Sequence, residues 1–141
     1  MFTQSNASPL SAVPIRMAIF LLTCLLALAA FSAGPAGAEE KRIAVAAIGD
    51  SEDALISPRT ARPSFILIFN QDAELIESHA NPVTRTRRAG PAMALWLAEH
   101  DVDVIIGERI GMNLVEGLVA VNIQGVEKSG RASDAVRELL E

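Results

Sequence analysis

Arginines gather in polar segments whose surroundings suggest anion binding. Arg85 and Arg88 belong to a basic run over residues 84–88, and Pro91, a residue favoured in the first turn of a helix, follows shortly after. Amide N–H groups of a first helical turn carry a partial positive charge, so guanidinium groups beside them are unfavourable unless an anion joins them. The basic run therefore predicts an anion site, with a mobile basic loop as the alternative.

Further candidate ligands lie in two loops that follow apolar runs. Arg59 and Arg62 follow the first apolar run after the N-terminal region, and Arg109, Gly111 and Asn113 follow a later one. If both runs are parallel strands, their carboxyl ends share one sheet edge, which is where α/β proteins bind ligands. The glycine spacing matches neither the dinucleotide-binding nor the P-loop pattern, so a nucleotide site is not supported. For Arg59 and Arg62, solvated loop charge is the alternative to anion binding.

The chain offers few residues for catalysis or for metal coordination. It has two histidines, His79 and His100, and one cysteine, Cys24. His79 is a candidate metal ligand because it precedes the basic run, whereas His100 ends a predicted helix, where a histidine ordinarily interacts with the helix dipole. The sequence contains no H-E-x-x-H, G-x-S-x-G or paired-carboxylate motif, and it therefore predicts a protein that is not an enzyme.

Residues 1–38 are expected to be a secretory signal peptide. An uncharged apolar run covers residues 17–31 and leads to a small-residue sequence ending at Ala38. This run is shorter than the roughly 20 residues that span a bilayer. Cleavage after Ala38 would release residues 39–141 into the periplasm with no stable membrane insertion; an uncleaved N-terminal anchor is the alternative.

The charge balance excludes some partners. The formal net charge is −5, and it becomes −6 when the signal peptide, whose only charged residue is Arg16, is removed. A negative net charge does not favour nucleic acid or an anionic membrane. Loss of Cys24 with the signal also excludes cysteine catalysis and cysteine-held clusters.

Apolar periodicity places the candidate residues on a framework of five strands and three helices. The expected strands cover 43–48, 65–69, 73–78, 102–106 and 120–123. Helices are expected to begin at Pro91, at Gly111 and at a Ser133 cap, with Trp96 and Val115 among the buried positions. A hairpin-rich start followed by helical crossovers predicts a mixed α/β sheet with strand order 3-2-1-4-5.

Five short motifs follow one another in a distinctive order. They are Ile43-Ala44-Val45, Ser57-Pro58-Arg59 with Arg62, Phe65-Ile66-Leu67-Ile68, Ala89-Gly90-Pro91, and Val102 to Gly107 with Ile110, Gly111 and Asn113. Over residues 42 to 140 this pattern resembles the dinitrogenase iron–molybdenum cofactor biosynthesis family, of the NifX/NafY type. The resemblance implies a ribonuclease H-like fold and non-catalytic binding or carriage of an iron–sulfur or iron–molybdenum cluster precursor.

These observations leave two main functions open. In the first, the arginine loops and His79 meet around one concavity at the sheet edge and bind a metal cluster or an oxyanion. In the second, the chain is an adaptor whose arginine loops dock an acidic protein partner. A hydrolase whose carboxylates the sequence does not pair is a third alternative.

Overall fold

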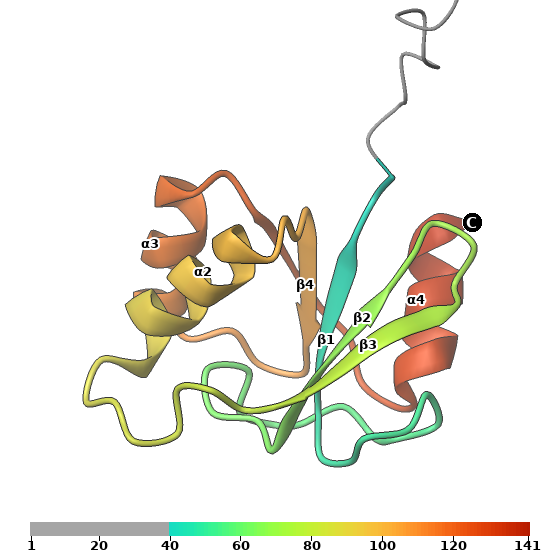
Figure 1. Cartoon of the computed structure of the whole chain (residues 1–141), viewed down its shortest axis with the longest axis horizontal. Helices are drawn as coiled ribbons and strands as arrows, with labels where there is room; N and C mark the ends of the chain where they lie inside the picture. The colour runs from blue at the N-terminus through green and yellow to red at the C-terminus, as the bar shows by residue number, and fades with distance from the viewer. Residues whose placement is uncertain (1–39) are drawn as a thin grey trace, which may run out of the picture. The chain divides into compact units, whose positions relative to one another are not determined.

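The computed structural model of this protein describes residues 40–141, so the expected signal peptide, its cleavage site and Cys24 lie outside the described residues. Figure 1 shows a twisted sheet between two helices on one side and a third helix on the other. None of the helices in this described part is long and apolar enough to cross a membrane.

Within residues 40–141 the elements follow the predicted order β-β-β-α-β-α-β-α. The strands are β1 (Ile43–Ala47), β2 (Phe65–Phe69), β3 (Leu75–Ala80), β4 (Val104–Gly107) and β5 (Gln124–Glu127). The helices are α2 (Ala89–Glu99), α3 (Met112–Ala120) and α4 (Ala132–Leu140). The strands form one five-stranded sheet in the order β3-β2-β1-β4-β5, which confirms the predicted topology.

The strand directions bring two of the arginine-bearing loops together. β1 runs antiparallel to β2 and parallel to β4, and β4 runs parallel to β5. The loops after β1 and β4 therefore meet at one edge, where the Thr60 hydroxyl donates a hydrogen bond to the Arg109 carbonyl at 2.7 Å. The expected shared edge is confirmed, while the ribonuclease H-like assignment stays a prediction from the family resemblance.

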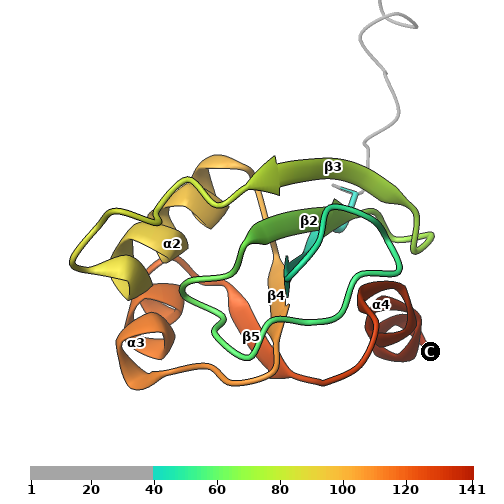
Figure 2. The same cartoon turned by 90° about the horizontal axis from the view of Figure 1, so that it is seen from below.

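Alternate residues of the central strands pack against helices on opposite faces of the sheet. In β1, Val45 joins Val136 of α4 in one buried cluster, and Ala44 joins Met93 and Leu97 of α2 in the other. Figure 2 shows α4 on one side of the sheet and α2 and α3 on the other. Because both faces are covered, the central strands are continuous apolar runs, which is why the sequence revealed them clearly.

The third strand begins later than predicted. Ala73, expected to start it, has a φ of 61°, a value that an extended strand excludes. The Asn70 side-chain oxygen accepts N–H bonds from Asp72 and Glu74 and closes the turn instead. β3 also ends later than predicted, at Ala80, so His79 lies within the strand.

The prediction for the last strand was also wrong. The apolar residues 120–123 do not form it, because α3 continues through Ala120 and Asn122 then adopts a left-handed φ of 59°. The strand is β5, which lies at the edge of the sheet and is largely exposed. An exposed edge strand has no need of an apolar run, and the sequence therefore gave no signal for it.

Three expectations about the helices also need correction. Trp96 is half-buried and not buried, and Val115 of α3 is exposed. Ser133 does not cap α4, because Arg131 occupies the N-cap position and no side chain caps this helix. Ser133 is instead buried in the first turn, where its backbone N–H donates to the Glu52 carbonyl at 2.9 Å.

Candidate functional site

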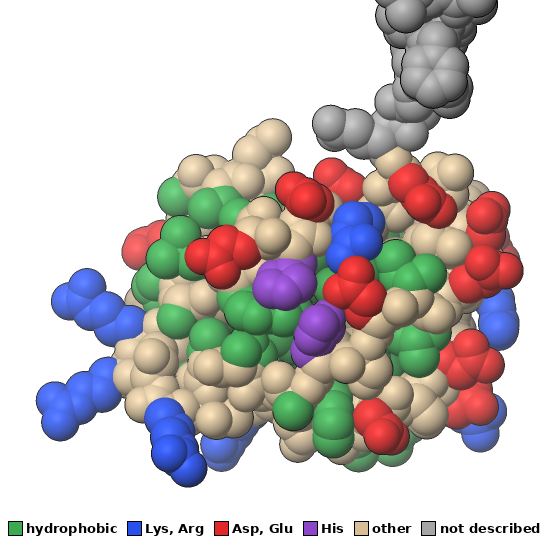
Figure 3. Space-filling view, viewed as in Figure 1, with side chains coloured by type: hydrophobic (Ala, Val, Ile, Leu, Met, Phe, Trp, Pro, Cys, Tyr) green, Lys and Arg blue, Asp and Glu red, His purple; other side chains and the backbone are tan. Residues whose placement is uncertain are grey.

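A cleft of about 630 Å³ opens where α2 and α3 begin. Arg62, Arg87 and Arg88 line it together with Gly111 and Asn113, and we refer to it as the arginine cleft. The other lining residues are Ala61, Ala89, Gly90, Pro91, Met112, Leu114 and Glu116. Figure 3 shows Lys and Arg side chains projecting from the side of the molecule on which both helices begin in Figure 1.

Glycines allow the first turns of α2 and α3 to approach closely. A Cβ atom at Gly90 would lie 2.8 Å from backbone atoms of Asn113 and Leu114, and at Gly117 it would lie 2.9 Å from the Ala94 Cβ. Neither position has room for a side chain unless the helices move apart. The N-termini of the two helices therefore form one continuous wall of the arginine cleft.

Both helix N-termini present unsatisfied positive charge to this cleft. The N-cap residues are Arg88 for α2 and Gly111 for α3, and neither helix has a side-chain cap or an acidic residue in its first turn. The amide N–H groups of Ala89 and Gly90 in α2, and of Met112 and Asn113 in α3, have no acceptor within their own helix. The third residue of each helix offers none, because Pro91 has no N–H and the Leu114 N–H donates to the Gly111 carbonyl at 3.0 Å. The amides that precede these residues remain available to a ligand, and the helix dipoles favour an anion there.

The arginine side chains add to the positive charge of the helix N-termini. The Arg62 guanidinium donates to the Thr84 carbonyl at 3.3 Å and to the Thr86 carbonyl at 2.9 Å, so it ties the loop after β1 to the basic run before α2. No ion pair among residues 40–141 involves Arg62, Arg87 or Arg88. Glu116 is the one carboxylate among the lining residues, so the cleft carries a net positive charge.

Three predicted anion ligands do not line the arginine cleft. Arg59, Arg85 and Arg109 are all exposed and lie outside its wall. The backbone of Arg109 is fixed by its bond from Thr60, beside Gly107, where a Cβ atom would overlap the Thr60 side chain. The structure thus brings Arg62, Arg88, Gly111 and Asn113 together and places Arg59, Arg85 and Arg109 outside the cleft.

His79 does not join the arginines, contrary to the expected single concavity. It lies near the end of α2 opposite the arginine cleft, with its ring centroid 5.1 Å from that of Trp96 and 5.3 Å from that of His100. The Trp96 and His100 rings are stacked at 3.7 Å. No group of three or more His, Cys, Asp or Glu side chains within the described residues could hold a metal ion. A metal-binding role for His79 therefore stays a prediction.

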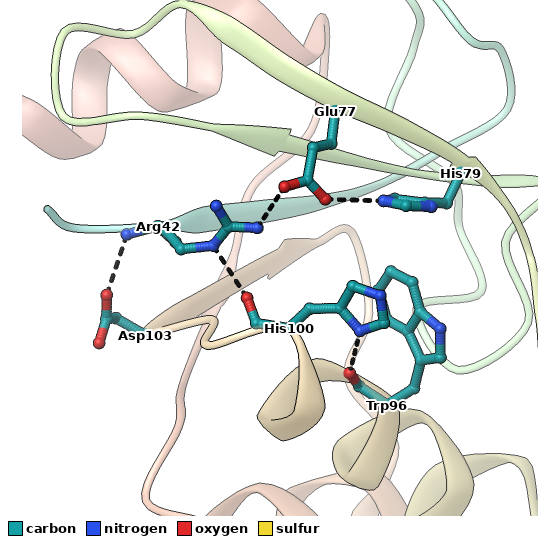
Figure 4. Close-up of polar contacts among 6 residues, drawn as sticks. All are labelled: Arg42, Glu77, His79, Trp96, His100 and Asp103. Carbon is teal, nitrogen blue, oxygen red and sulfur yellow. Dashed lines mark hydrogen bonds and ion pairs between the residues drawn. The ribbon is translucent and has the colours of Figure 1, made fainter.

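A second polar network surrounds these histidines (Figure 4). Arg42 donates to Glu77 at 2.6 Å and to the His100 carbonyl at 2.8 Å, and His79 Nε2 donates to the other Glu77 oxygen at 2.8 Å. The hydrogen bond from Arg42, followed by that from His79, holds the pKa of Glu77 below its usual value. The network closes the C-terminal end of α2 against β1 and β3.

The lowered pKa predicts a pH-dependent contribution of Glu77 to stability. As the pH falls below the ordinary glutamate value of about 4.3, the unfolded chain takes up a proton at this position before the folded chain does. Glu77 therefore stabilises the fold above that pH, and this contribution is lost as the pH falls through the lowered pKa. Urea unfolding followed by Trp96 fluorescence should show Glu77→Gln less stable than wild type at pH 6, with a smaller difference in the free energy of unfolding at pH 3. An equal difference at both pH values would contradict this, and Glu99→Gln, an exposed carboxylate on α2, is the control.

Sequence reasoning missed this network and one cleft residue. Arg42 meets Glu77 and His100 across separations of 35 and 58 residues, and no local pattern signals such contacts. Arg87 lies in the basic run that the sequence did identify. Its position next to the α2 N-cap was the signal that could have singled it out.

The comparisons with known proteins agree with this architecture. The family model for the dinitrogenase iron-molybdenum cofactor matches residues 41–141. The apo form of the orange protein from Desulfovibrio gigas is similar, with a TM-score of 0.66 and 25% identity over 74% of this chain and 90% of that one. An NMR structure of a Thermotoga protein proposed to be NifB shares the fold, with a TM-score of 0.60 and 22% identity over 70% of this chain and 86% of that one. No curated protein matches the chain.

Proposed function

This chain belongs to the dinitrogenase iron-molybdenum cofactor family, and from this premise we propose that it binds and carries an anionic metal cluster, or a related oxyanion, without catalysing a reaction. The cargo would be an iron–sulfur or iron–molybdenum cluster precursor. The observation that supports this most directly is the arginine cleft, in which three guanidinium groups and two uncapped helix N-termini surround one space.

In this proposal the cleft holds its cargo by charge and hydrogen bonds. Arg62, Arg87 and Arg88 offer N–H donors to the oxide or sulfide atoms of an anion, and charge-assisted bonds of this kind are the strong ones. The lining residues include no histidine or cysteine, so the metal would keep its own ligands. Cargo bound in this way leaves without breaking a metal–protein bond, which suits transfer to another protein.

Metal analysis of the protein purified anaerobically from its own cells tests this proposal. We expect iron or molybdenum to co-purify with the wild-type chain and to be lost from an Arg87→Ala/Arg88→Ala variant. A wild-type protein without either metal, recovered together with an acidic protein, would contradict carriage and support the adaptor function.

One observation favours the adaptor as the second candidate. Arg59, Arg85 and Arg109 are exposed outside the arginine cleft and form no ion pair within residues 40–141. Guanidinium groups in this state are available to the carboxylates of a protein partner. In the metal analysis the two functions differ in outcome, because the adaptor requires no metal.

We also propose that the protein is exported to the periplasm and that the signal peptide is cleaved after Ala38. The intact mass of the protein recovered from the periplasm should then equal that of residues 39–141. Recovery of the full-length chain in the membrane fraction would contradict cleavage and support the N-terminal anchor.

A further inference from the structure

A second concave surface lies between α3 and β5, with a volume of about 410 Å³. We call it the β5 groove, and its lining residues are Ile110, Val115, Leu118, Val119, Ile123, Gly125 and Glu127. It shares none of these residues with the arginine cleft. Five of its lining side chains are aliphatic, and Val119 is 75% exposed. Val115 is exposed as well, whereas Leu118 and Ile123 are buried. Exposed apolar side chains that group together mark an interaction site.

The backbone beside this groove is also unpartnered. β5 ends the strand order, and within residues 40–141 it pairs with β4 alone. On the β4 side, the Gln124 N–H donates to the Asp103 carbonyl, and the Lys128 N–H donates to the Gly107 carbonyl. Backbone groups alternate in direction along a strand, so those of Gly125 and Glu127 face the open edge. An open edge of this kind is a template for one more strand.

We propose that the β5 groove binds an extended segment of a partner protein, which adds to the sheet as a sixth strand beside β5. Alternate side chains of that segment would be apolar and would enter the groove, because successive residues of a strand point to opposite faces. The segment would carry a basic residue at the end that lies against Glu127, the charged residue of the lining.

Charge favours this occupant over a second copy of the same chain. The chain has a formal net charge of −5, and pairing two copies along β5 would add a second Glu127 to the interface. In Glu127, Oε1 already accepts the Ile110 N–H at 3.0 Å, which orients the carboxylate at the groove. The Glu127 carboxylate attracts a basic segment, whereas it repels the acidic residues of a second copy.

Selection of peptides from a random dodecapeptide display library provides the first test. The full chain is the target, and counter-selection uses Val119→Asp, which places a carboxylate in the groove at a position exposed enough to preserve the fold. We expect enriched peptides that alternate apolar and polar residues, carry Lys or Arg near one end, and bind Val119→Asp at least tenfold more weakly. Leu95→Asp, at a 59% exposed position on α2, is the matched control and should bind like wild type.

Backbone pairing is tested with the tightest of these peptides. Two peptides would be made, one N-methylated at its odd-numbered residues and one at its even-numbered residues. One of them should lose binding and the other should keep it, because only one set of amides faces β5. Hydrogen exchange at Gly125 and Glu127 should be fast in the peptide-free chain and slow in the complex.

Three results would overturn the proposal. One is a selection that yields no peptide able to distinguish wild type from Val119→Asp. Another is equal tolerance of N-methylation in both registers. The third is slow hydrogen exchange at the Gly125 and Glu127 amides in the absence of peptide. If this protection rises with protein concentration, the occupant is a second copy of the chain. If the protection does not depend on concentration, the occupant is another segment of the same chain.

Discussion

Replacing Arg87 and Arg88 together by alanine is expected to weaken binding of an anaerobically reconstituted iron–sulfur cluster, or of molybdate, by roughly a hundredfold. Both side chains line the arginine cleft and form no ion pair within the described residues. A hydrogen bond to a charged group contributes about 1.5 to 3 kcal/mol, and each 1.4 kcal/mol corresponds to about a tenfold change in affinity. Titration of each anion into wild type and variant measures the effect.

The matched control removes the same charge from outside the cleft. Arg59→Ala/Arg85→Ala also deletes two exposed guanidinium groups, but neither lines the arginine cleft. We expect this variant to bind within about threefold of wild type, because exposed charges at a distance are screened by salt. Equal losses in the two double variants would show that net charge, and not the cleft, controls binding.

Gly90→Ala is expected to lower the free energy of unfolding by about 1 to 3 kcal/mol, the usual range for overpacking a close contact. The added Cβ would lie 2.8 Å from the backbone of Asn113 and Leu114, which cannot rotate away as a side chain could. Elsewhere in a helix, alanine in place of glycine is stabilising by roughly 0.5 to 1 kcal/mol. The sign of the change is therefore diagnostic. Urea unfolding followed by the single tryptophan, Trp96, measures it.

The same substitution should also weaken molybdate binding by roughly tenfold, because separating α2 from α3 moves one helix N-terminus away from the cleft. Gly111→Ala provides the control for stability, since a Cβ there meets nothing within 4 Å and its φ of −71° suits any residue. Gly111→Ala replaces a favoured N-cap residue without overpacking, so we expect it to lower the free energy of unfolding by less than Gly90→Ala does. A Gly90→Ala protein more stable than wild type would refute the close approach of the two helices.

The sequence predicted the buried part of the fold well and its edges poorly. β1, β2 and β4 are covered by helices on both faces, so their apolar runs identified them and the strand order followed. β5 is exposed, and β3 starts after a residue with positive φ, so neither boundary was visible in hydrophobic periodicity. Local hydrophobic patterns indicate which strands are buried. An edge strand depends instead on which other strand lies beside it.

The sequence likewise predicted some residues of the candidate site and not others. Arg88, Gly111 and Asn113 were recognised because they lie at helix starts, which have local sequence signals. The side chains that reach the cleft depend on how α2 packs against α3, and the contact of Gly90 with Asn113 decides this. The expected partnership of His79 with the arginines was wrong because it depended on where β3 ends. His79 lies one residue before the end of β3, and its ring lies beside that of Trp96 at the far end of α2.

Anomalous X-ray diffraction from crystals loaded anaerobically with the cluster or with molybdate tests the proposed carriage most directly. Data collected at the iron or molybdenum absorption edge locate the metal without reference to any protein ligand. We predict one dominant peak inside the arginine cleft, within reach of the Arg62, Arg87 and Arg88 guanidinium groups. A dominant peak beside His79 and His100, or crystals that bind the metal with no peak in the cleft, would contradict the assignment of this cleft as the cargo site.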